Sequence, residues 1–193
     1  MDKENLKKFI QNIFPRASPR LDEIVGYFKE IHFAKNEYLV KEGQVDNCYL
    51  YIETGFMRAY TLDTEGNEVT TWLYSKNQIA FEVGSFINRI PSKENIQAVV
   101  DCSGWYITFD QLQLLFHTYP EFREYGRGLL VSALITLKER MLSMINMTAE
   151  QRYEQLITTR PEIFQYVSLK HIASYLGITD TSLSRIRKEM LTK

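Results

Sequence analysis

Residues 168–190, SLKHIASYLGITDTSLSRIRKEM, constrain the fold more than any other stretch because they have the pattern of two short helices joined by a tight turn. Gly177 stands at the corner, where a residue without a Cβ can adopt the left-handed backbone that such a turn needs. Thr179 follows at a position that can cap the second helix. This pattern predicts a helix-turn-helix. The residues expected to face inward are all apolar: Ile172, Ala173, Leu176, Leu183 and Ile186.

The outward face of the second predicted helix combines hydroxyl groups with cationic side chains. Such groups hydrogen-bond base edges and phosphates when a helix enters the major groove of DNA. The alternative is an ordinary helical hairpin in a protein core, since many alanine-glycine helix corners never meet nucleic acid. The candidates for DNA contact are Thr179, Thr181, Ser182, Ser184, Arg185 and Lys188.

The overall charge gives the DNA-binding interpretation little help. The chain of 193 residues has a formal net charge of −1, whereas nucleic-acid binders usually present a basic face. The segment 177–193 carries a small cationic surplus, which two copies in a dimer would double. A hydrophobic content of 45% is enough for a packed core, so the chain is expected to be folded throughout.

The cysteines and histidines argue against a resident cofactor. Cys48 and Cys102 form no CxxC pair, and the three histidines have no ligand spacing, so no metal, haem or iron–sulfur site is expected. Reduced, isolated cysteines favour a cytoplasmic location. The charged amino terminus is unlike a secretory signal, and the longest apolar stretch is too short to cross a bilayer, so no membrane contact is expected.

Hydrophobic periodicity divides the chain into four stretches. Residues 2–30 have helical spacing, interrupted around residues 15–19. From 31 to 109, short alternating runs punctuated by Gly43, Gly55 and Gly66 predict an all-β sandwich or barrel. Residues 120–147 predict one long helix, and everything from Thr148 onward is again helical in pattern.

The long predicted helix is more apolar than one small domain can cover. Pairing with a second copy of the chain in a parallel homodimer would bury it, and packing across the barrel of its own chain is the alternative. The predicted fold class is therefore α+β, with a β-barrel, flanking helices and a long dimerisation helix. The expected units are 1–117 for the barrel domain, 118–147 for the long helix and 148–193 for the helix-turn-helix domain.

This arrangement resembles the Crp/Fnr superfamily of bacterial transcription regulators. The likeness is carried by the three glycines, by AFEVGSF at 80–86 and, most specifically, by IASYLGITDTSLSRIRK at 172–188. It implies a cyclic-nucleotide-binding-like jelly-roll sensor domain, a homodimer through the long helix, and a helix-turn-helix that reads double-stranded DNA. RNA polymerase and a small-molecule effector are the further partners that the likeness suggests.

The resemblance also points to a ligand pocket. Cyclic-nucleotide binders of this kind carry a glycine-glutamate pair that opens a short helix, followed further along by an arginine-serine pair. Here Glu82 occupies the glutamate position, Phe81 replaces the glycine, and Ser92-Lys93 stands where arginine-serine belongs. Arg89 lies nearby but out of register. The ligand-binding candidates, which are vestigial if the cassette is degenerate, are Glu82, Val83, Gly84, Ser85, Arg89, Ser92 and Lys93.

A degenerate cassette has a predictable cost. Loss of one charge-assisted pair to a buried phosphate weakens binding by about 1.5–3 kcal/mol, so we expect weak or absent binding of cyclic AMP and an unknown effector. The alternative for Glu82 is a hydrogen-bonded carboxylate that the scaffold retains without a ligand.

Residue by residue, the likeness makes Arg185 the main base reader, with a bidentate contact to guanine. Thr181 stands where relatives often have glutamate, so the operator should differ from the best-known sites of the family. Because only a short stretch follows Lys188, we expect the β-hairpin wing usual in the family to be missing or vestigial. A second hypothesis is a sensor or docking module that does not bind DNA. An enzyme ranks third, because no paired nucleophile and base, phosphate loop or metal spacing is found in the sequence.

Overall fold

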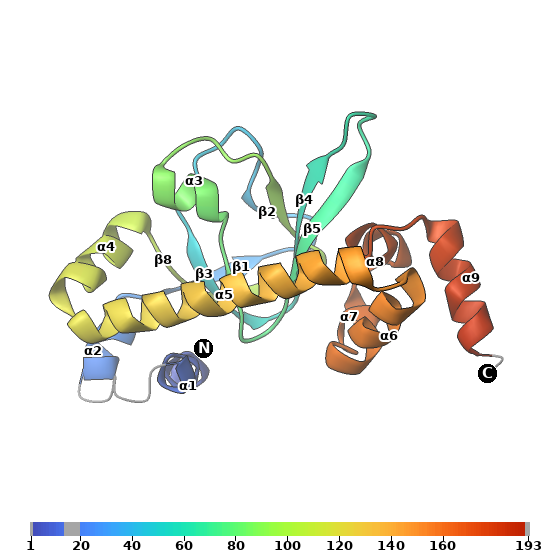
Figure 1. Cartoon of the computed structure of the whole chain (residues 1–193). Helices are drawn as coiled ribbons and strands as arrows, with labels where there is room; N and C mark the ends of the chain where they lie inside the picture. The colour runs from blue at the N-terminus through green and yellow to red at the C-terminus, as the bar shows by residue number, and fades with distance from the viewer. Residues whose placement is uncertain (1, 14–19, 192–193) are drawn as a thin grey trace.

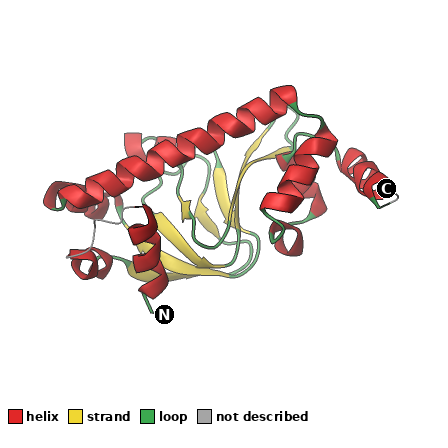
Figure 2. Cartoon of the chain, turned by 60° about the horizontal axis from the view of Figure 1, so that its bottom comes forward, coloured by secondary structure: helices red, strands yellow, loops and turns green. Residues whose placement is uncertain are grey.

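The computed structural model of the protein describes residues 2–13 and 20–191, so the expected interruption at 15–19 lies outside the described residues. The helix α5 (Pro120–Asn146) runs along the whole molecule (Figure 1). The strands and the amino-terminal helices lie along most of its length, and the carboxy-terminal helices gather at its far end. Figure 2 shows the same arrangement from below, with the strands on one side of α5.

Eight strands form the β part of the described chain, and they alternate with turns as the sequence predicts. Their bounds are β1 (Lys29–Phe33), β2 (Tyr38–Val40), β3 (Tyr49–Thr54), β4 (Met57–Leu62), β5 (Glu68–Tyr74), β6 (Ile79–Ala80), β7 (Asn95–Ala98) and β8 (Cys102–Ile107). They pair antiparallel in two four-stranded sheets, with the orders β1-β8-β3-β6 and β2-β7-β4-β5. The predicted α+β fold is confirmed, but its β part is two facing sheets of jelly-roll type and not a closed barrel.

Helices flank both ends of the two sheets. They are α1 (Glu4–Ile13), α2 (Leu21–Gly26), α3 (Val83–Asn88), α4 (Phe109–Thr118), α6 (Ala149–Thr159), α7 (Ile163–Tyr166), α8 (Leu169–Tyr175) and α9 (Asp180–Met190). The helical pattern at the amino terminus ends earlier than the sequence suggests, because β1 already begins at Lys29. No strand follows α9 within the described residues, which end at Leu191. None of the described helices is long and apolar enough to span a membrane.

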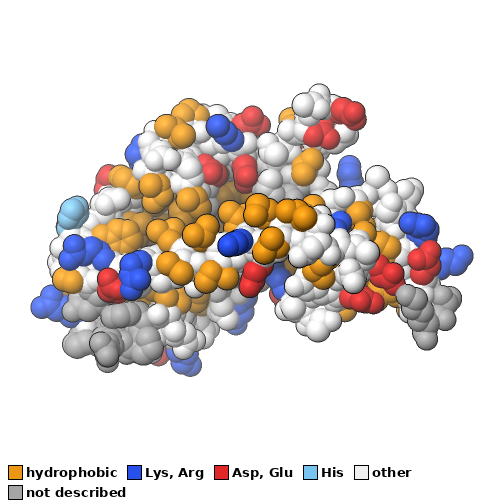
Figure 3. All heavy atoms as spheres, viewed as in Figure 1, with side chains coloured by type: hydrophobic (Ala, Val, Ile, Leu, Met, Phe, Trp, Pro, Cys, Tyr) orange, Lys and Arg blue, Asp and Glu red, His pale blue; other side chains and the backbone are white. Residues whose placement is uncertain are grey.

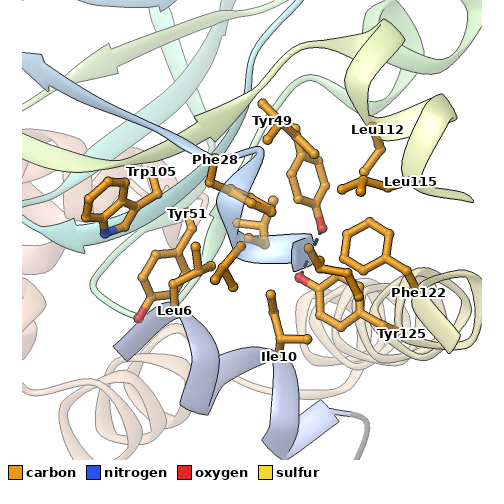
Figure 4. Packing of buried hydrophobic residues seen from close by; sticks show 14 of the residues in the cluster. Leu6, Ile10, Phe28, Tyr49, Tyr51, Trp105, Leu112, Leu115, Phe122 and Tyr125 are labelled. Atoms are coloured by element: carbon orange, nitrogen blue, oxygen red, sulfur yellow. Dashed lines mark hydrogen bonds between the residues drawn. The ribbon is translucent and has the colours of Figure 1, made fainter. Parts of the chain in front are cut away.

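The main core lies where α1, α2, α4 and the first half of α5 cover the outer face of the β1-β8-β3-β6 sheet. Leu6 and Ile10 of α1 point up into this core in Figure 4, Leu6 beside Tyr51 of β3 and Ile10 toward Tyr125 of α5. In the same cluster the hydroxyl groups of Tyr49 and Tyr125 lie 3.2 Å apart and share a hydrogen bond. This pairing satisfies two buried polar groups and fixes the start of α5 against the sheet.

Gly104 lets the central strands β3 and β8 approach closely. A Cβ added to Gly104 would lie 2.1 Å from the carbonyl oxygen of Tyr51, a backbone atom that cannot move aside. Gly104→Ala is therefore expected to lower the free energy of unfolding by at least about 2 kcal/mol. Urea denaturation measures the change. Gly26→Ala is the matched control, because nothing lies within 4 Å of its added Cβ; an equal loss in both variants would contradict the explanation.

The helix α5 changes character along its length. Phe122 and Tyr125 near its start are buried, and Gly126 there allows close packing, because a Cβ would meet the Phe116 ring at 2.8 Å. Further along, apolar side chains face solvent and form a stripe that Figure 3 shows along the helix. Leu134 is 65% exposed and Ile145 is 75% exposed. The exposed stripe consists of Leu130, Val131, Leu134, Ile135, Leu137, Met141, Leu142, Met144 and Ile145.

Candidate nucleic-acid interface and sensor pocket

The helix-turn-helix forms as its sequence pattern predicts. Gly177 has the left-handed φ of 69°, and the amide of Ile178 donates to the carbonyl of Ala173 across the turn at 3.0 Å. The hydroxyl of Thr179 caps α9 by accepting from the amide of Ser182 at 3.2 Å. The five predicted inward residues are all buried: Ile172, Ala173, Leu176, Leu183 and Ile186.

The outward face of α9 brings most of the candidate DNA contacts together. Thr181, Ser184, Arg185 and Lys188 are exposed, and Ser182 is half-buried. The hydroxyl of Thr179 is engaged with the start of α9 and is a cap first, with hydroxyl contacts to Thr181 and Ser182 at 2.9 and 3.0 Å. The guanidinium of Arg185 forms no hydrogen bond or ion pair with any residue in ranges 2–13 and 20–191. In Figure 1 α9 stands at the outer end of the molecule, away from the sheets.

The first helix of the motif, α8, is docked on strand β5 of the sheet domain. The amide of Thr70 donates to the hydroxyl of Ser174 at 2.8 Å, and that hydroxyl donates to the carbonyl of Glu68 at 3.3 Å. The guanidinium of Arg140 on α5 bridges the two elements, because it donates to the carbonyl of Thr71 and, at 3.1 Å, to that of Tyr175. We call these contacts the β5–α8 junction.

A buried arginine supports the same junction from inside the sheet. Arg58 is 1% exposed, pairs with Glu68 and lies 4.1 Å from the centre of the Tyr60 ring. His171 of α8 approaches the same Glu68 carboxylate at 3.9 Å. Burial and the nearby Arg58 charge lower the pKa of His171, so this imidazole is neutral at physiological pH. The junction therefore couples the helix-turn-helix to the sheet through charged groups and backbone carbonyls.

The segment that resembles a phosphate cassette forms the short helix α3. The Glu82 carboxylate caps this helix and accepts hydrogen bonds from the amides of Gly84 and Ser85 at 3.0 and 2.6 Å. The Ser85 hydroxyl accepts a hydrogen bond from the amide of Asp46. The carboxylate of Asp46 in turn accepts a hydrogen bond from the amide of Glu82 at 2.7 Å. Burial raises the pKa of the Asp46 carboxyl to about 6. The amides that would bind an anion are thus already occupied by the chain's own carboxylate.

Arg89 does not join this site. It ends α3 with a left-handed φ of 56° and is not among the residues that line the pocket described below. Its guanidinium donates to the carbonyl of Asp46 at 2.6 Å and to the side-chain oxygen of Asn47 at 3.2 Å. It also lies 4.5 Å from the centre of the Phe109 ring. Arg89 therefore braces the outside of α3.

The pair Ser92-Lys93 also lies apart from the pocket lining. Ser92 is 3% exposed, and its hydroxyl donates to the carbonyl of Glu94 at 2.6 Å while accepting from the Glu94 amide at 3.1 Å. The Ser92 hydroxyl is therefore engaged as donor and as acceptor within this turn. The Lys93 side chain is exposed. Of the seven ligand-binding candidates, Glu82 and Val83 line the pocket described next.

A pocket of about 500 Å³ lies between strand β5, the segment leading into α3, and α5. Sequence reasoning singled out neither of the charged residues that join Glu82 in its wall, Glu94 and Arg140. Glu94 follows the cassette pair directly, and Arg140 is the first cation after Lys138 on the long helix, but neither position carries a local motif. The apolar and aromatic lining includes Phe9, Trp72, Tyr74, Ile79, Phe81, Val83, Leu129, Leu130, Ala133 and Leu137.

Both cysteines, Cys48 and Cys102, are free. Cys102 is buried, and burial raises the pKa of its thiol to about 11. Burial also raises the pKa of the half-buried Cys48 thiol well above its usual value. Both are held as neutral thiols at physiological pH. In the described part of the chain, no group of three or more His, Cys, Asp or Glu residues could hold a metal ion.

Comparison with known proteins gives consistent matches. Residues 30–119 match the family model of the cyclic nucleotide-binding domain. The chain is 24% identical to the anaerobic regulatory protein of Haemophilus influenzae over 86% of its length and 68% of that protein. It is 25% identical to electron transport regulator A of Shewanella oneidensis, over 86% of this chain and 70% of the relative.

Solved structures show the same fold. A protein of Eubacterium rectale, described as a transcriptional regulator of the Crp/Fnr family, has a TM-score of 0.71 at 16% identity, with 94% of this chain and 88% of that chain covered. The c-di-GMP-responsive global regulator CLP of Xanthomonas campestris has a TM-score of 0.70 at 14% identity, with 89% and 90% covered.

The fold and the two candidate sites define a class of proteins in which a cyclic-nucleotide-binding type of domain is joined by a long helix to a helix-turn-helix. Residues 30–119 match the cyclic nucleotide-binding domain, and the relatives and the solved structures include regulators of this architecture, in agreement with the resemblance found in the sequence. The curated relatives carry the names of regulators, in agreement with the prediction that this chain is not an enzyme.

Proposed function

We propose that the protein is a homodimeric transcription regulator that binds operator DNA through α9 and responds to a small-molecule effector. The observation that carries this proposal is the outward face of α9. There the guanidinium of Arg185, which has no partner in the described part of the chain, stands among exposed hydroxyl groups on a capped helix. A helix of this kind, standing clear of the rest of the molecule, is suited to enter a major groove. In this proposal residues 1–117 sense, 118–147 dimerise and 148–193 bind DNA.

The exposed stripe on α5 supports the homodimer. Nine large apolar side chains in one helix face solvent in the single chain, which is far more than scattered surface residues would give. A second copy of α5 packed in parallel buries both stripes and relates the two α9 helices by a two-fold axis. RNA polymerase remains a further proposed partner, by analogy with the family.

Three features of the pocket support weak or absent binding of cyclic AMP. The amides of Gly84 and Ser85 are occupied by Glu82, the guanidinium of Arg89 is hydrogen-bonded to the carbonyl of Asp46, and neither Arg89 nor Lys93 lines the pocket. A cyclic phosphate entering here would meet no free guanidinium from the cassette. Its negative charge would instead lie near Glu82 and Glu94, which disfavours it electrostatically.

The β5–α8 junction supplies a route from the pocket to the DNA-binding helices. Arg140 lines the pocket and also hydrogen-bonds the carbonyls of Thr71 and Tyr175. An effector that moves β5 or α5 therefore changes the contacts that hold α8, and α9 moves with α8 because they share one core. Effector binding and DNA affinity are linked in this way.

Selection of duplexes from a random pool, followed by titration at several salt concentrations, tests the proposal. We expect a selected site with two inverted half-sites about one helical turn apart. We also expect log affinity to fall linearly with log salt concentration, because phosphate contacts release counterions. Failure to enrich any duplex, with and without cell extract metabolites, would favour the second hypothesis of a sensor or docking module that does not bind DNA.

A further inference from the structure

We propose that the pocket between β5, α3 and α5 binds a small organic cation with an apolar body, and not a phosphate-bearing anion. This inference deepens the proposed function, since it assigns a chemical class to the effector of that site. It rests on three properties of the pocket: its aromatic wall, its balance of charge and the position of Glu94.

The wall of the pocket is suited to the apolar part of such a ligand. Trp72 and Tyr74 lie side by side on β5, with ring centres 6.5 Å apart, and Phe81 adds a third ring from the segment before α3. Aromatic faces attract ammonium groups through their quadrupole, and rings gathered in one site are the usual way in which proteins hold organic cations. A volume of about 500 Å³ is in the range of small-molecule sites.

The charged groups of the pocket are predominantly acidic. Glu82 and Glu94 contribute two carboxyl groups, and Arg140 is the single cation among the described residues of the lining. The guanidinium of Arg140 is directed to backbone carbonyls of Thr71, Thr70 and Tyr175, so few of its donors are left for a ligand. The site therefore has one more potential negative charge than positive charge, and the guanidinium of Arg140 is already hydrogen-bonded to the backbone.

Glu94 is the group that would pair with the ligand. Its carboxylate accepts one hydrogen bond from the Thr71 hydroxyl at 2.9 Å, and it forms no ion pair with any described residue. Burial, and then the nearby Glu82, raise the pKa of Glu94, whereas the Thr71 hydrogen bond and the Arg140 charge lower it. The net shift is upward, so the charge of Arg140 does not fully offset burial and Glu82. Burial, and then Glu94 and two other acidic groups, raise the pKa of Tyr74 on the same wall. An ammonium group beside Glu94 would supply the missing charge.

Three probes of one shape separate the charge requirement from simple apolar binding. They are 2-phenylethylammonium, 2-phenylethanol and 3-phenylpropionate, each titrated to millimolar concentration into the full-length chain. The readout is the indole N–H resonance of Trp72 in a proton–nitrogen correlation spectrum, assigned with a Trp72→Phe variant. Trp105, the second tryptophan of the chain, lies in the main core outside the pocket lining and is an internal control.

We expect the ammonium probe to shift the Trp72 resonance, to leave the Trp105 resonance unchanged and to bind about tenfold more tightly than the carboxylate probe, a gap typical of one charge-assisted pair. Glu94→Gln should abolish most of this preference while leaving binding of the alcohol unchanged. Glu65→Gln, in the exposed turn between β4 and β5, is the matched control and should leave all three affinities unchanged.

The proposal would be overturned if the carboxylate probe bound as tightly as the ammonium probe or more tightly. It would also be overturned if cyclic AMP shifted the Trp72 resonance with a micromolar dissociation constant. A Trp72 resonance that none of the probes shifts would likewise overturn it. The comparison of probes on the unaltered chain decides the question even if Glu94→Gln fails to fold. Since no DNA is present, failure here leaves the DNA-binding proposal standing, and failure to bind DNA leaves this one standing.

Discussion

Leu134→Arg is expected to convert the protein from a dimer to a monomer and to lower its affinity for a two-fold operator by about a hundredfold or more, because one half-site then binds without the other. Leu134 lies in the middle of the exposed α5 stripe and outside the pocket lining. A guanidinium there costs nothing in the isolated chain, where the side chain is 65% exposed, but would be buried against the partner helix in a dimer.

Sedimentation velocity measures the change in assembly, and a mobility shift on the selected operator measures the change in affinity. Leu114→Arg is the matched control: Leu114 is an exposed leucine on α4, 48% accessible and outside the stripe. It should leave both measurements unchanged. A Leu134→Arg protein that still sediments as a dimer would show that the α5 stripe is covered in some other way.

Arg185→Ala is expected to weaken operator binding by about 1–3 kcal/mol, or roughly tenfold to a hundredfold, and to relax the base preference at one position in each half-site. The physical reason is the loss of a planar fork of donors that can pair with two acceptors on one guanine. The chain should fold as before, because Arg185 is exposed and has no partner among the described residues.

Arg185→Lys distinguishes base reading from simple charge. Lysine keeps the positive charge but not the bidentate geometry, so affinity should recover in part while base preference stays relaxed. Lys35→Ala, an exposed cation in the turn between β1 and β2, should change neither quantity. If Arg185→Ala lowers affinity equally for all sequences, Arg185 is a phosphate contact and the base reader lies elsewhere on α9.

The helix-turn-helix could be predicted almost to the residue because everything that specifies it is local. Gly177 supplies the left-handed turn, Thr179 caps the next helix, and the apolar spacing sets which faces meet. The strands and α5 could be predicted for the same reason. The prediction of a β-barrel was less accurate, because alternation along a strand shows which face is buried but not whether a sheet closes on itself.

The candidate ligand-binding residues could be predicted from local sequence patterns only in part. Glu82 was found from the cassette pattern, but the capping role of its carboxylate depends on the geometry of the amides of Gly84 and Ser85. The place of Arg89 outside the pocket goes with its contacts to Asp46 and Asn47, more than 40 residues away in the chain. Neither the capping role of Glu82 nor the position of Arg89 can be predicted from the spacing of residue types.

Local patterns were enough to predict the order of the elements, the helix-turn-helix and its exposed cation, and the apolar character of α5, since each depends on neighbours within a few turns of chain. That Glu94 and Arg140 share one pocket, and that Arg140 also contacts α8, became visible only in the folded chain. These residues come from segments far apart in the chain, and their meeting depends on how α5 packs across β5. Packing of that kind is a property of the whole fold, so no local pattern records it.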